Sequence, residues 1–256
     1  MLLAIDIGNT AITLGVFRQD ALAASWRLAT DPGRLPDEYG ALLLNLLGHE
    51  GLETAQIDAA SMCSVVPDME QVFREVCGRY LNLSPLVVET GVRTGLRILY
   101  DSPRDVGADR VVDAVAAMHL YGTPLVIVDL GTATVFDAIN REGEYLGGAI
   151  APGVGIGAEA LFQRAAKLYR VEMSKPLSAI GRNTVAALQS GIVFGNIGLI
   201  EGLVARFKEE LGDDAKVIAT GGYADLLAEG TAIVDHVNPN LTLLGLRLIY
   251  EMNRGA

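Results

Sequence analysis

Two segments of this chain, 123 residues apart, share one pattern of strand, aspartate, apolar residue and glycine. The first is residues 4–8 (AIDIG) and the second is residues 127–131 (IVDLG). Each continues through a small polar turn into a second β-type run, which is typical of a β-hairpin. Because such a hairpin opens each half of a 256-residue chain, the pattern predicts two duplicated domains, residues 1–118 and 119–256.

The rest of the chain alternates between apolar β-type runs and segments with helical periodicity. Strands are expected at 2–7, 12–17, 26–30, 59–66, 86–88, 125–128, 135–139 and 216–220. Helices are expected at 36–47, 69–81, 109–120, 158–168, 184–207 and 243–253, with a glycine-rich loop at 147–157 before the fourth. Strands and helices that alternate in this way predict an α/β fold.

The charge balance excludes several classes of function. The chain has 31 Asp and Glu against 20 Lys and Arg, a net charge of −11, which argues against binding nucleic acid or anionic lipid. Its two cysteines cannot form a disulfide framework or a CxxC-type zinc site. The N-terminus lacks the basic region of a secretory signal, and glycines, Pro152 and Glu159 interrupt the longest apolar stretch. The sequence therefore predicts a cytoplasmic protein that does not span a membrane.

The paired hairpins have the chemistry of a phosphate site. Glycine lets the backbone approach a ligand closely, and successive N–H groups in such a turn bind phosphate oxygens. Asn9, Thr10, Thr132 and Thr134 add neutral polar side chains, while Asp6 and Asp129 offer carboxylates to cations. Residues 6–17 contain no Lys or Arg, and no GxxxxGK[ST] motif occurs. Backbone N–H groups and bound cations must therefore neutralise any polyphosphate bound here.

A second polar segment, residues 100–110 (YDSPRDVGADR), leads into a predicted helix. At a helix N-terminus the dipole stabilises a carboxylate, so Asp109 is expected to be ionised, with a pKa of about 4. It is suited to accept a proton from a substrate hydroxyl in phosphoryl transfer, and Arg110 to bind a substrate carboxylate. The structural alternative is that Asp109 caps the helix and Arg110 is solvated.

The order and spacing of the motifs resemble the type III pantothenate kinases, from residue 1 to residue 253. The motifs are 6–10 (DIGNT), 37–40 (DEYG), 64–67 (SVVP), Tyr100 with Pro103, 107–110 (GADR), 128–134 (VDLGTAT), 147–153 (GGAIAPG), 183–184 (NT), 189–191 (QSG) and 219–222 (ATGG). This family belongs to the actin, sugar-kinase and Hsp70 ATPase superfamily. The resemblance implies two duplicated ribonuclease H-like domains with an interdomain nucleotide cleft. It also implies a homodimer that phosphorylates the hydroxyl of pantothenate with ATP, the first step of coenzyme A biosynthesis.

The resemblance also assigns site residues. The expected nucleotide-binding residues are Asp6, Ile7, Gly8, Asn9, Thr10, Ala11, Ile12, Thr13 and Thr132. The expected pantothenate-binding residues are Tyr100, Gly107, Ala108, Asp109, Arg110 and Thr184, with Asp109 as the catalytic base. Asp129 is expected to ligate a monovalent cation, potassium or ammonium, in addition to the Mg²⁺ that accompanies ATP. Ala11-Ile12 and Pro36 depart from the residues common in the family, and the first departure bears on nucleotide affinity.

Three other functions remain open on the sequence alone. Residues 153–157 (GVGIG), with Glu172 farther on, loosely match a dinucleotide-binding fingerprint and so an NAD-linked oxidoreductase. A non-catalytic nucleotide-binding relative would be expected to lack Asp109 or Asp129, and both are present. A sugar kinase would use the same hairpins with a different acceptor, whereas Arg110 favours an acidic one. The three histidines are far apart in sequence, and neither a zinc-protease nor a hydrolase motif occurs.

Overall fold

The computed structural model describes residues 1–164 and 168–255, which form two compact units. Unit 1 comprises residues 1–95, 102–116 and 242–255 of the described chain, and unit 2 comprises residues 96–101 and 117–241. The division differs from a single boundary after residue 118, because the C-terminal helix packs within unit 1. The domain limits expected from the repeat therefore stay a prediction.

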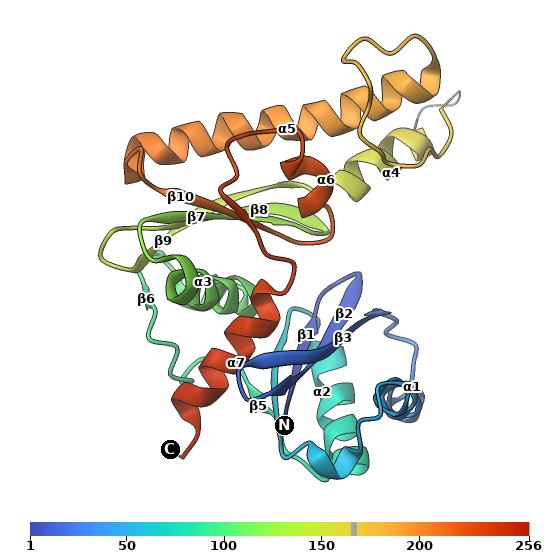
Figure 1. Ribbon diagram of the computed structural model, residues 1–256, viewed down its shortest axis with the longest axis vertical. Helices are drawn as coiled ribbons and strands as arrows, with labels where there is room; N and C mark the ends of the chain where they lie inside the picture. Colours follow the sequence, from blue (N-terminus) through green and yellow to red (C-terminus); the bar gives the residue numbers. More distant parts are fainter. Residues whose placement is uncertain (165–167, 256) are drawn as a thin grey trace. The chain divides into compact units, whose positions relative to one another are not determined.

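Unit 1 is built on a five-stranded mixed sheet in the order β3-β2-β1-β4-β5 (Figure 1). The strands are β1 (Leu2–Ile7), β2 (Ala11–Arg18), β3 (Ala21–Ala29), β4 (Ala59–Ser64) and β5 (Leu86–Val87). The first two form the expected antiparallel hairpin, in which Ile7 pairs with Ile12, and β4 runs parallel to β1. The carboxyl ends of β1 and β4 therefore lie side by side.

The two faces of this sheet have different partners. Helices α1 (Pro36–His49) and α2 (Pro67–Val76) pack on the face that carries Leu3, Ile5 and Ile7, and form one continuous core with it. Alternation of side chains sends Ala4 and Asp6 to the opposite face. On that face Gly15 of β2 lies against Leu243 of α7 (Leu241–Asn253). Gly245 of α7 in turn packs on Val112 of α3 (Ala108–Tyr121).

Unit 2 has a six-stranded sheet in the order β11-β10-β7-β8-β9-β6. The strands are β6 (Arg97–Ile98), β7 (Leu125–Leu130), β8 (Ala133–Ile139), β9 (Glu144–Pro152), β10 (Lys216–Thr220) and β11 (His236–Val237). Helices α4 (Val154–Arg164), α5 (Thr184–Leu211) and α6 (Ala224–Ala228) supply apolar residues to the core on one face of this sheet. Figure 1 shows α5 running along that face.

The two sheets repeat one topology, which confirms the duplication. The order β3-β2-β1-β4-β5 in unit 1 matches β9-β8-β7-β10-β11 in unit 2, with the same parallel and antiparallel pairings. The fold is thus α/β with two ribonuclease H-like domains. The turns differ by one residue, because Ile7 pairs with Ile12 whereas Leu130 pairs with Thr134. In strand register, Thr132 therefore matches Thr10, and Asn9 is an extra residue of the first turn.

One expected element was wrong. Residues 147–152 form the end of strand β9 and not a loop, and the following helix begins at Val154. Gly147 and Gly148 obscured this strand in the sequence because glycine is typical of turns. The expected helix also extended into residues 165–167, which lie outside the described residues. Helix α2 is shorter than expected, because Cys77–Leu81 continue it as a π-helical turn.

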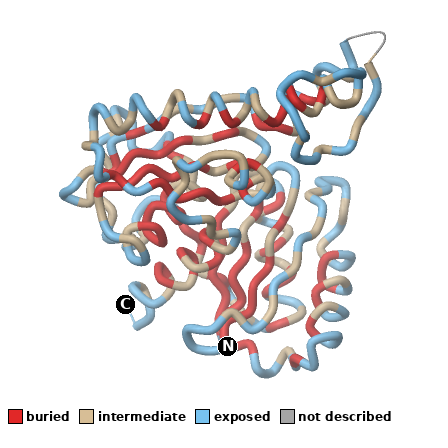
Figure 2. The backbone as a smooth tube through the Cα atoms, turned by 45° about the horizontal axis from the view of Figure 1, so that its top comes forward, coloured by how far each residue is buried: buried red, intermediate tan, exposed pale blue. Residues whose placement is uncertain are grey.

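Helix α5 is long and apolar enough, by length and composition alone, to cross a membrane, and it is the one such helix in the described part of the chain. Its apolar stretch is 39% buried within the structure. Figure 2 shows buried residues recurring along one side of this helix. They include Ile192, Val193, Ile197, Ile200 and Val204, which belong to the core of unit 2. Packing on a sheet accounts for the apolar face of α5.

Candidate active site

The first glycine turn joins β1 to β2 in unit 1. The Gly8 N–H donates to the Ala11 carbonyl at 3.0 Å, and a side chain at Gly8 would crowd that oxygen. Asn9 and Thr10 at the tip are exposed. Ile7 and Ile12, at the two ends of the turn, are fully buried, so of the expected nucleotide-binding residues these two contribute apolar packing. Thr13 pairs with Asp6 across the hairpin.

A cluster of carboxyl groups lies below this turn on the α3 side of the sheet. The Cys63 thiol on β4 is fully buried and donates to Asp6 Oδ1 at 3.5 Å. Burial first, and then the charges of Asp6, Asp109 and Asp113, raise the pKa of Cys63 well above its ordinary value. Three carboxylates therefore act on one thiol, and the structure brings Asp6 and Asp109 to the same region of unit 1.

Asp109 lies in the first turn of α3, half-buried. Its Oδ1 accepts a hydrogen bond from the Arg110 backbone N–H at 2.8 Å. Burial raises the pKa of Asp109 above its ordinary value, while the Arg110 N–H and guanidinium oppose this shift. The expectation of an ordinary pKa near 4 was wrong, because desolvation outweighs the helix dipole and the neighbouring cation. A raised pKa makes the carboxylate a stronger base.

The glycine two residues before Asp109 leaves room for this carboxylate. A Cβ at Gly107 would lie 2.5 Å from Asp109 Oδ1. The Gly107 carbonyl also accepts the Val111 N–H at 3.2 Å, which starts the helix, and Ala108 is its first residue. The spacing of Gly107 and Asp109 thus has a steric reason.

The second glycine turn joins β7 to β8 in unit 2. Asp129, near the carboxyl end of β7, is enclosed by glycines: both of its carboxylate oxygens lie 3.4 Å from where a Cβ of Gly131 would be. A Cβ on Gly221, after β10, would collide with Asp129 Oδ1. Gly221 also has a φ of 91°, a region that favours glycine. Thr132 at the tip is exposed.

Two expected pantothenate-binding residues lie elsewhere in unit 2. Tyr100 packs edge-on against Tyr145, with ring centroids 6.4 Å apart, and its ring lies 3.2 Å from where a Cβ of Gly147 would be. Thr184 is exposed at the start of α5, one residue after Asn183, whose side chain accepts the Ala186 N–H at 2.9 Å. A cavity of about 470 Å³ opens there, and its lining includes Tyr169 and Gln189.

The expected residues therefore fall into separate groups within each unit. Unit 1 brings the first turn together with residues 107–110. In unit 2 the cavity at Thr184 is lined by neither Tyr100, Asp129 nor Thr132. Cys63 and Asp113 were missed as members of the carboxylate cluster. The position of Asp113, four residues after Asp109 on a helix, places both on one face and is the signal that would have found it.

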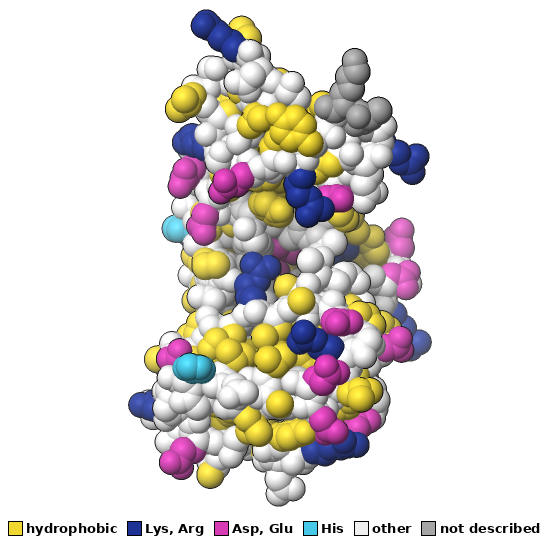
Figure 3. Space-filling view, turned by 90° about the vertical axis from the view of Figure 1, so that its right-hand side faces the viewer, with side chains coloured by type: hydrophobic (Ala, Val, Ile, Leu, Met, Phe, Trp, Pro, Cys, Tyr) yellow, Lys and Arg dark blue, Asp and Glu magenta, His cyan; other side chains and the backbone are white. Residues whose placement is uncertain are grey.

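The carboxylates suit a cation carried with phosphate better than a resident metal. Among the described residues, no group of three or more His, Cys, Asp or Glu is arranged to hold a metal ion. Mg²⁺ in phosphoryl-transfer sites is commonly held by one or two carboxylates together with the substrate phosphates. Asp6 and Asp129 can each fill that role. On the face drawn in Figure 3, Lys and Arg are interspersed with Asp and Glu.

The comparison with sequence families decides the assignment. The profile described as type III pantothenate kinase matches residues 2–206. A protein named type III pantothenate kinase from Dehalococcoides mccartyi (strain CBDB1) is 50% identical over 253 residues, which cover 99% of this chain and 96% of that protein. The chain belongs to the type III pantothenate kinase family. The family resemblance read from the motifs is confirmed.

Solved structures at low sequence identity share the fold. A protein from Campylobacter jejuni assigned to the Baf family of transcriptional activators has a TM-score of 0.63 at 19% identity, covering 99% of this chain and 100% of that one. The ethanolamine utilization protein EutJ from Carboxydothermus hydrogenoformans has a TM-score of 0.56 at 17% identity, covering 96% and 89%. At these identities the likeness concerns the fold alone.

The structure also tests the dinucleotide-binding alternative. The strand before residues 153–157 is β9, which pairs antiparallel with β8 and parallel with the two-residue strand β6. Because β6 comes before β9 in the chain, the helix that follows β9 does not connect these two parallel strands. A dinucleotide fingerprint needs a strand, turn and helix within a parallel βαβ unit. A Cβ on Gly153 would collide with the carbonyls of Gly131 and Thr132. Gly153 therefore allows the backbone after β9 to pack closely against the second glycine turn. The NAD-linked interpretation was wrong.

Proposed function

We propose that this protein transfers the γ-phosphoryl group of ATP to the primary hydroxyl of pantothenate, giving 4'-phosphopantothenate and ADP. Two observations support this: membership of the family over nearly the whole chain, and the half-buried Asp109 in a cluster with Asp6. The second carries the chemistry, because phosphoryl transfer needs a base at the acceptor hydroxyl close to the phosphate-binding turn.

The reaction assigns one proton and one bond exchange to named groups. The Asp109 carboxylate accepts the proton of the acceptor hydroxyl as its oxygen bonds to the γ-phosphorus. The bond from that phosphorus to the β,γ-bridging oxygen breaks, and ADP leaves with the bonding electrons. Gly107 keeps the space that the Asp109 carboxylate occupies.

The first turn binds phosphate oxygens through the Asn9 backbone N–H and the side chains of Asn9 and Thr10. The family resemblance also assigns Thr132 of the second turn to ATP. When bound, Mg²⁺ neutralises the phosphate charge and polarises the phosphorus–oxygen bonds. Asp6 is the carboxylate that we assign to it. Asp129 would hold the monovalent cation, K⁺ or NH₄⁺, and this assignment is supported by Gly131 and Gly221, whose missing side chains leave the space that its carboxylate occupies.

The acceptor would be held by groups that match its chemistry. The Arg110 guanidinium is suited to the pantothenate carboxylate, since it can form a bidentate pair. The family resemblance also assigns Tyr100 and Thr184, which carry hydroxyl groups, to pantothenate. The active form would be a cytoplasmic homodimer, and light scattering coupled to gel filtration should give twice the mass of the chain.

The test is ADP release from MgATP, measured with and without pantothenate. We expect pantothenate-dependent turnover, and a loss of at least about 100-fold in kcat for Asp109→Asn, because general-base catalysis contributes about 10²–10⁴-fold. Asp213→Asn, an exposed aspartate after α5, is the matched control and should retain activity. Turnover that does not require pantothenate, or that survives in Asp109→Asn, would contradict the proposal.

A further inference from the structure

The motif at residues 37–40 has no place in the chemistry described above, yet hydrogen bonds connect it to the first turn through the segment that carries Thr30. The Thr30 hydroxyl donates to the Gly8 carbonyl at 2.6 Å, and the Thr30 N–H donates to the Thr10 carbonyl at 3.1 Å. These two bonds engage the carbonyl groups on both sides of Asn9.

Fixing these carbonyls also fixes the donors of the turn. In a trans peptide the carbonyl and the following N–H point in opposite directions. Because the Gly8 carbonyl is directed at Thr30, the Asn9 N–H faces away from it, and Asn9 is itself exposed. A phosphate oxygen needs such N–H groups held in one orientation, since a turn that must reorder on binding loses affinity.

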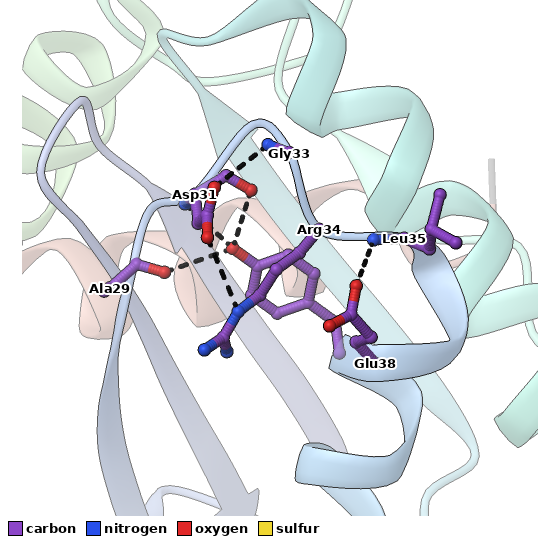
Figure 4. Close-up of polar contacts among 7 residues, drawn as sticks. Ala29, Asp31, Gly33, Arg34, Leu35 and Glu38 are labelled. Atoms are coloured by element: carbon purple, nitrogen blue, oxygen red, sulfur yellow. Dashed lines mark hydrogen bonds and ion pairs between the residues drawn. The ribbon is translucent and has the colours of Figure 1, made fainter.

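Thr30 is held in turn by the hydroxyl of Tyr39 on α1. This hydroxyl donates to the Ala29 carbonyl at 3.1 Å and accepts the Asp31 N–H at 3.0 Å, so it fixes both neighbours of Thr30 (Figure 4). The Tyr39 ring is fully buried and packs on Phe73 with centroids 5.1 Å apart. The position of the hydroxyl is therefore set by the core.

The residues around Tyr39 hold the same segment in place. Glu38 accepts the Leu35 N–H at 2.8 Å, and Asp31 Oδ1 accepts the Gly33 N–H at 3.0 Å (Figure 4). Asp37 accepts the Tyr80 hydroxyl at 2.7 Å, which ties the start of α1 to the π-helical turn after α2. Within the 37–40 motif, Glu38 and Tyr39 thus anchor the segment that carries Thr30, whereas Asp37 contacts the π-helical turn and not this segment.

Unit 2 offers an internal comparison. The residue that matches Thr30 in the repeat is Gly153, which likewise follows the outer strand of the hairpin pair. Gly153 has no side chain, and it lies so close to the Gly131 and Thr132 carbonyls that a Cβ would not fit. A hydroxyl clamp is therefore a property of the first turn, which is also one residue longer.

We propose that Thr30 and Tyr39 are positioning residues for ATP: the Tyr39 hydroxyl fixes Ala29–Asp31, and Thr30 holds the first turn in its phosphate-binding conformation. The inference rests on the assignment of this turn to ATP in the proposed function. It predicts a defect specific to the nucleotide, because neither residue contacts the 107–110 segment in any hydrogen bond or ion pair described for them.

The test uses pairs of variants that differ by one group. Thr30→Val removes the hydroxyl at nearly constant shape, and Thr30→Ser restores it. Tyr39→Phe removes only the hydroxyl of a buried ring, and Tyr80→Phe is its control, because it makes the same change at the neighbouring contact with Asp37. For each protein, kcat, both KM values and the rise in melting temperature caused by MgATP without pantothenate are measured.

We expect Thr30→Val to raise the KM for ATP about tenfold, the equivalent of one hydrogen bond of about 1.4 kcal/mol, and Tyr39→Phe to raise it about fivefold. The KM for pantothenate should change less than twofold, and Thr30→Ser and Tyr80→Phe should resemble the wild type. The MgATP-induced rise in melting temperature should shrink in Thr30→Val and Tyr39→Phe only.

Equal rises in both KM values, or a Thr30→Ser protein as impaired as Thr30→Val, would overturn the proposal. If Tyr39→Phe does not fold, the Thr30 pair decides alone. A wild-type protein that MgATP stabilises but that shows no pantothenate-dependent turnover would contradict the proposed function. In that case the melting-temperature comparison still tests the clamp.

Discussion

At the scale of single residues, burial raises the pKa of both Asp109 and Cys63. Asp6, Gly8, Gly107 and Asp109 could be singled out because each belongs to a short motif with a physical reason. The raised pKa of Asp109 could not be predicted, because it depends on burial by residues distant in sequence, and a helix N-terminus alone suggests the opposite direction. Cys63 could not be assigned to the site for the same reason, since the contact of its thiol with Asp6 joins residues far apart in the sequence.

The pKa of Asp109 gives a prediction about stability. Because burial raises this pKa in the folded chain, the ionised carboxylate costs stability at pH 7, and this cost disappears below the unfolded pKa of about 3.9. Asp109→Asn should therefore raise the melting temperature at pH 7, by about 2–4 °C for each kcal/mol relieved in a chain of this size. The gain should diminish as the pH is lowered towards 4.

Thermal unfolding of both proteins between pH 4 and pH 8 checks this, with Asp213→Asn as the exposed control. A melting temperature at pH 7 that is lower in Asp109→Asn than in the wild type would mean that the carboxylate is stabilising. It would then contradict the raised pKa.

The glycine at 107 gives a prediction about catalysis. Gly107→Ala should push the Asp109 carboxylate aside, because the new Cβ would lie 2.5 Å from Oδ1. A displacement of this kind should lower kcat by about 10–100-fold with little change in the KM for ATP. Gly48→Ala on α1, where a Cβ meets nothing within 4 Å, is the control. Steady-state kinetics that show equal activity in both variants would exclude the steric role.

At the scale of elements, periodicity found most helices and strands, and failed where tertiary pairing decides. The sequence of the second half of strand β9 is typical of a glycine-rich loop, but pairing with β8 extends the strand through Gly147 and Gly148. The two-residue strands β6 and β11 exist only because a longer strand lies beside them, so no local signal marks them. Helix α7 contacts β2 and α3 and lies in unit 1.

Arg247 joins α7 to the β2–β3 hairpin of unit 1 by an ion pair. Its guanidinium pairs with Glu251 at 2.8 Å and with Asp20 in the turn between β2 and β3, and lies 5.8 Å from the Phe17 ring centroid. Only 11% of the Arg247 side chain is exposed, but Asp20 is 87% exposed and Glu251 is 45% exposed, so solvent screens both ion pairs. Arg247→Met should retain the packing of the stem and cost about 0.2–1 kcal/mol.

Chemical denaturation of this variant should show that loss as a lower midpoint with an unchanged slope. Arg206→Met on α5 is the control, because the bond recorded for the Arg206 side chain among the described residues goes to the Gly202 carbonyl of its own helix. If the two variants lose equal stability, the contact of Arg247 with the hairpin is not what holds α7.

At the scale of the whole molecule, the duplication could be predicted and the net charge counted from the sequence, and both bear on how the chain binds phosphate. The duplication gives two glycine turns at the ends of equivalent strands, and each has a carboxylate, Asp6 or Asp129, two residues before its glycine. What the sequence could not give is the difference between the turns. The first turn is one residue longer and its Gly8 carbonyl accepts a hydrogen bond from the Thr30 hydroxyl, whereas the second turn packs directly against the backbone of Gly153. The difference depends on how closely the residue after the outer strand approaches the turn in each unit.

Net charge leads to the last prediction. A chain of charge −11 with no Lys or Arg in residues 6–17 must bind a polyanion and an anionic acceptor. One uncompensated unit pair of like charge at about 4 Å costs roughly 4 kcal/mol at an effective dielectric of about 20. Activity should therefore require K⁺ or NH₄⁺ as well as Mg²⁺. At constant ionic strength, replacing K⁺ by Na⁺ should lower kcat/KM for ATP by at least about tenfold, because general screening is unchanged and only the bound ion differs. Asp129→Asn should lose the distinction between K⁺ and Na⁺. Equal turnover in the two salts for the wild type, or a preserved K⁺ preference in the variant, would show that Asp129 has another role.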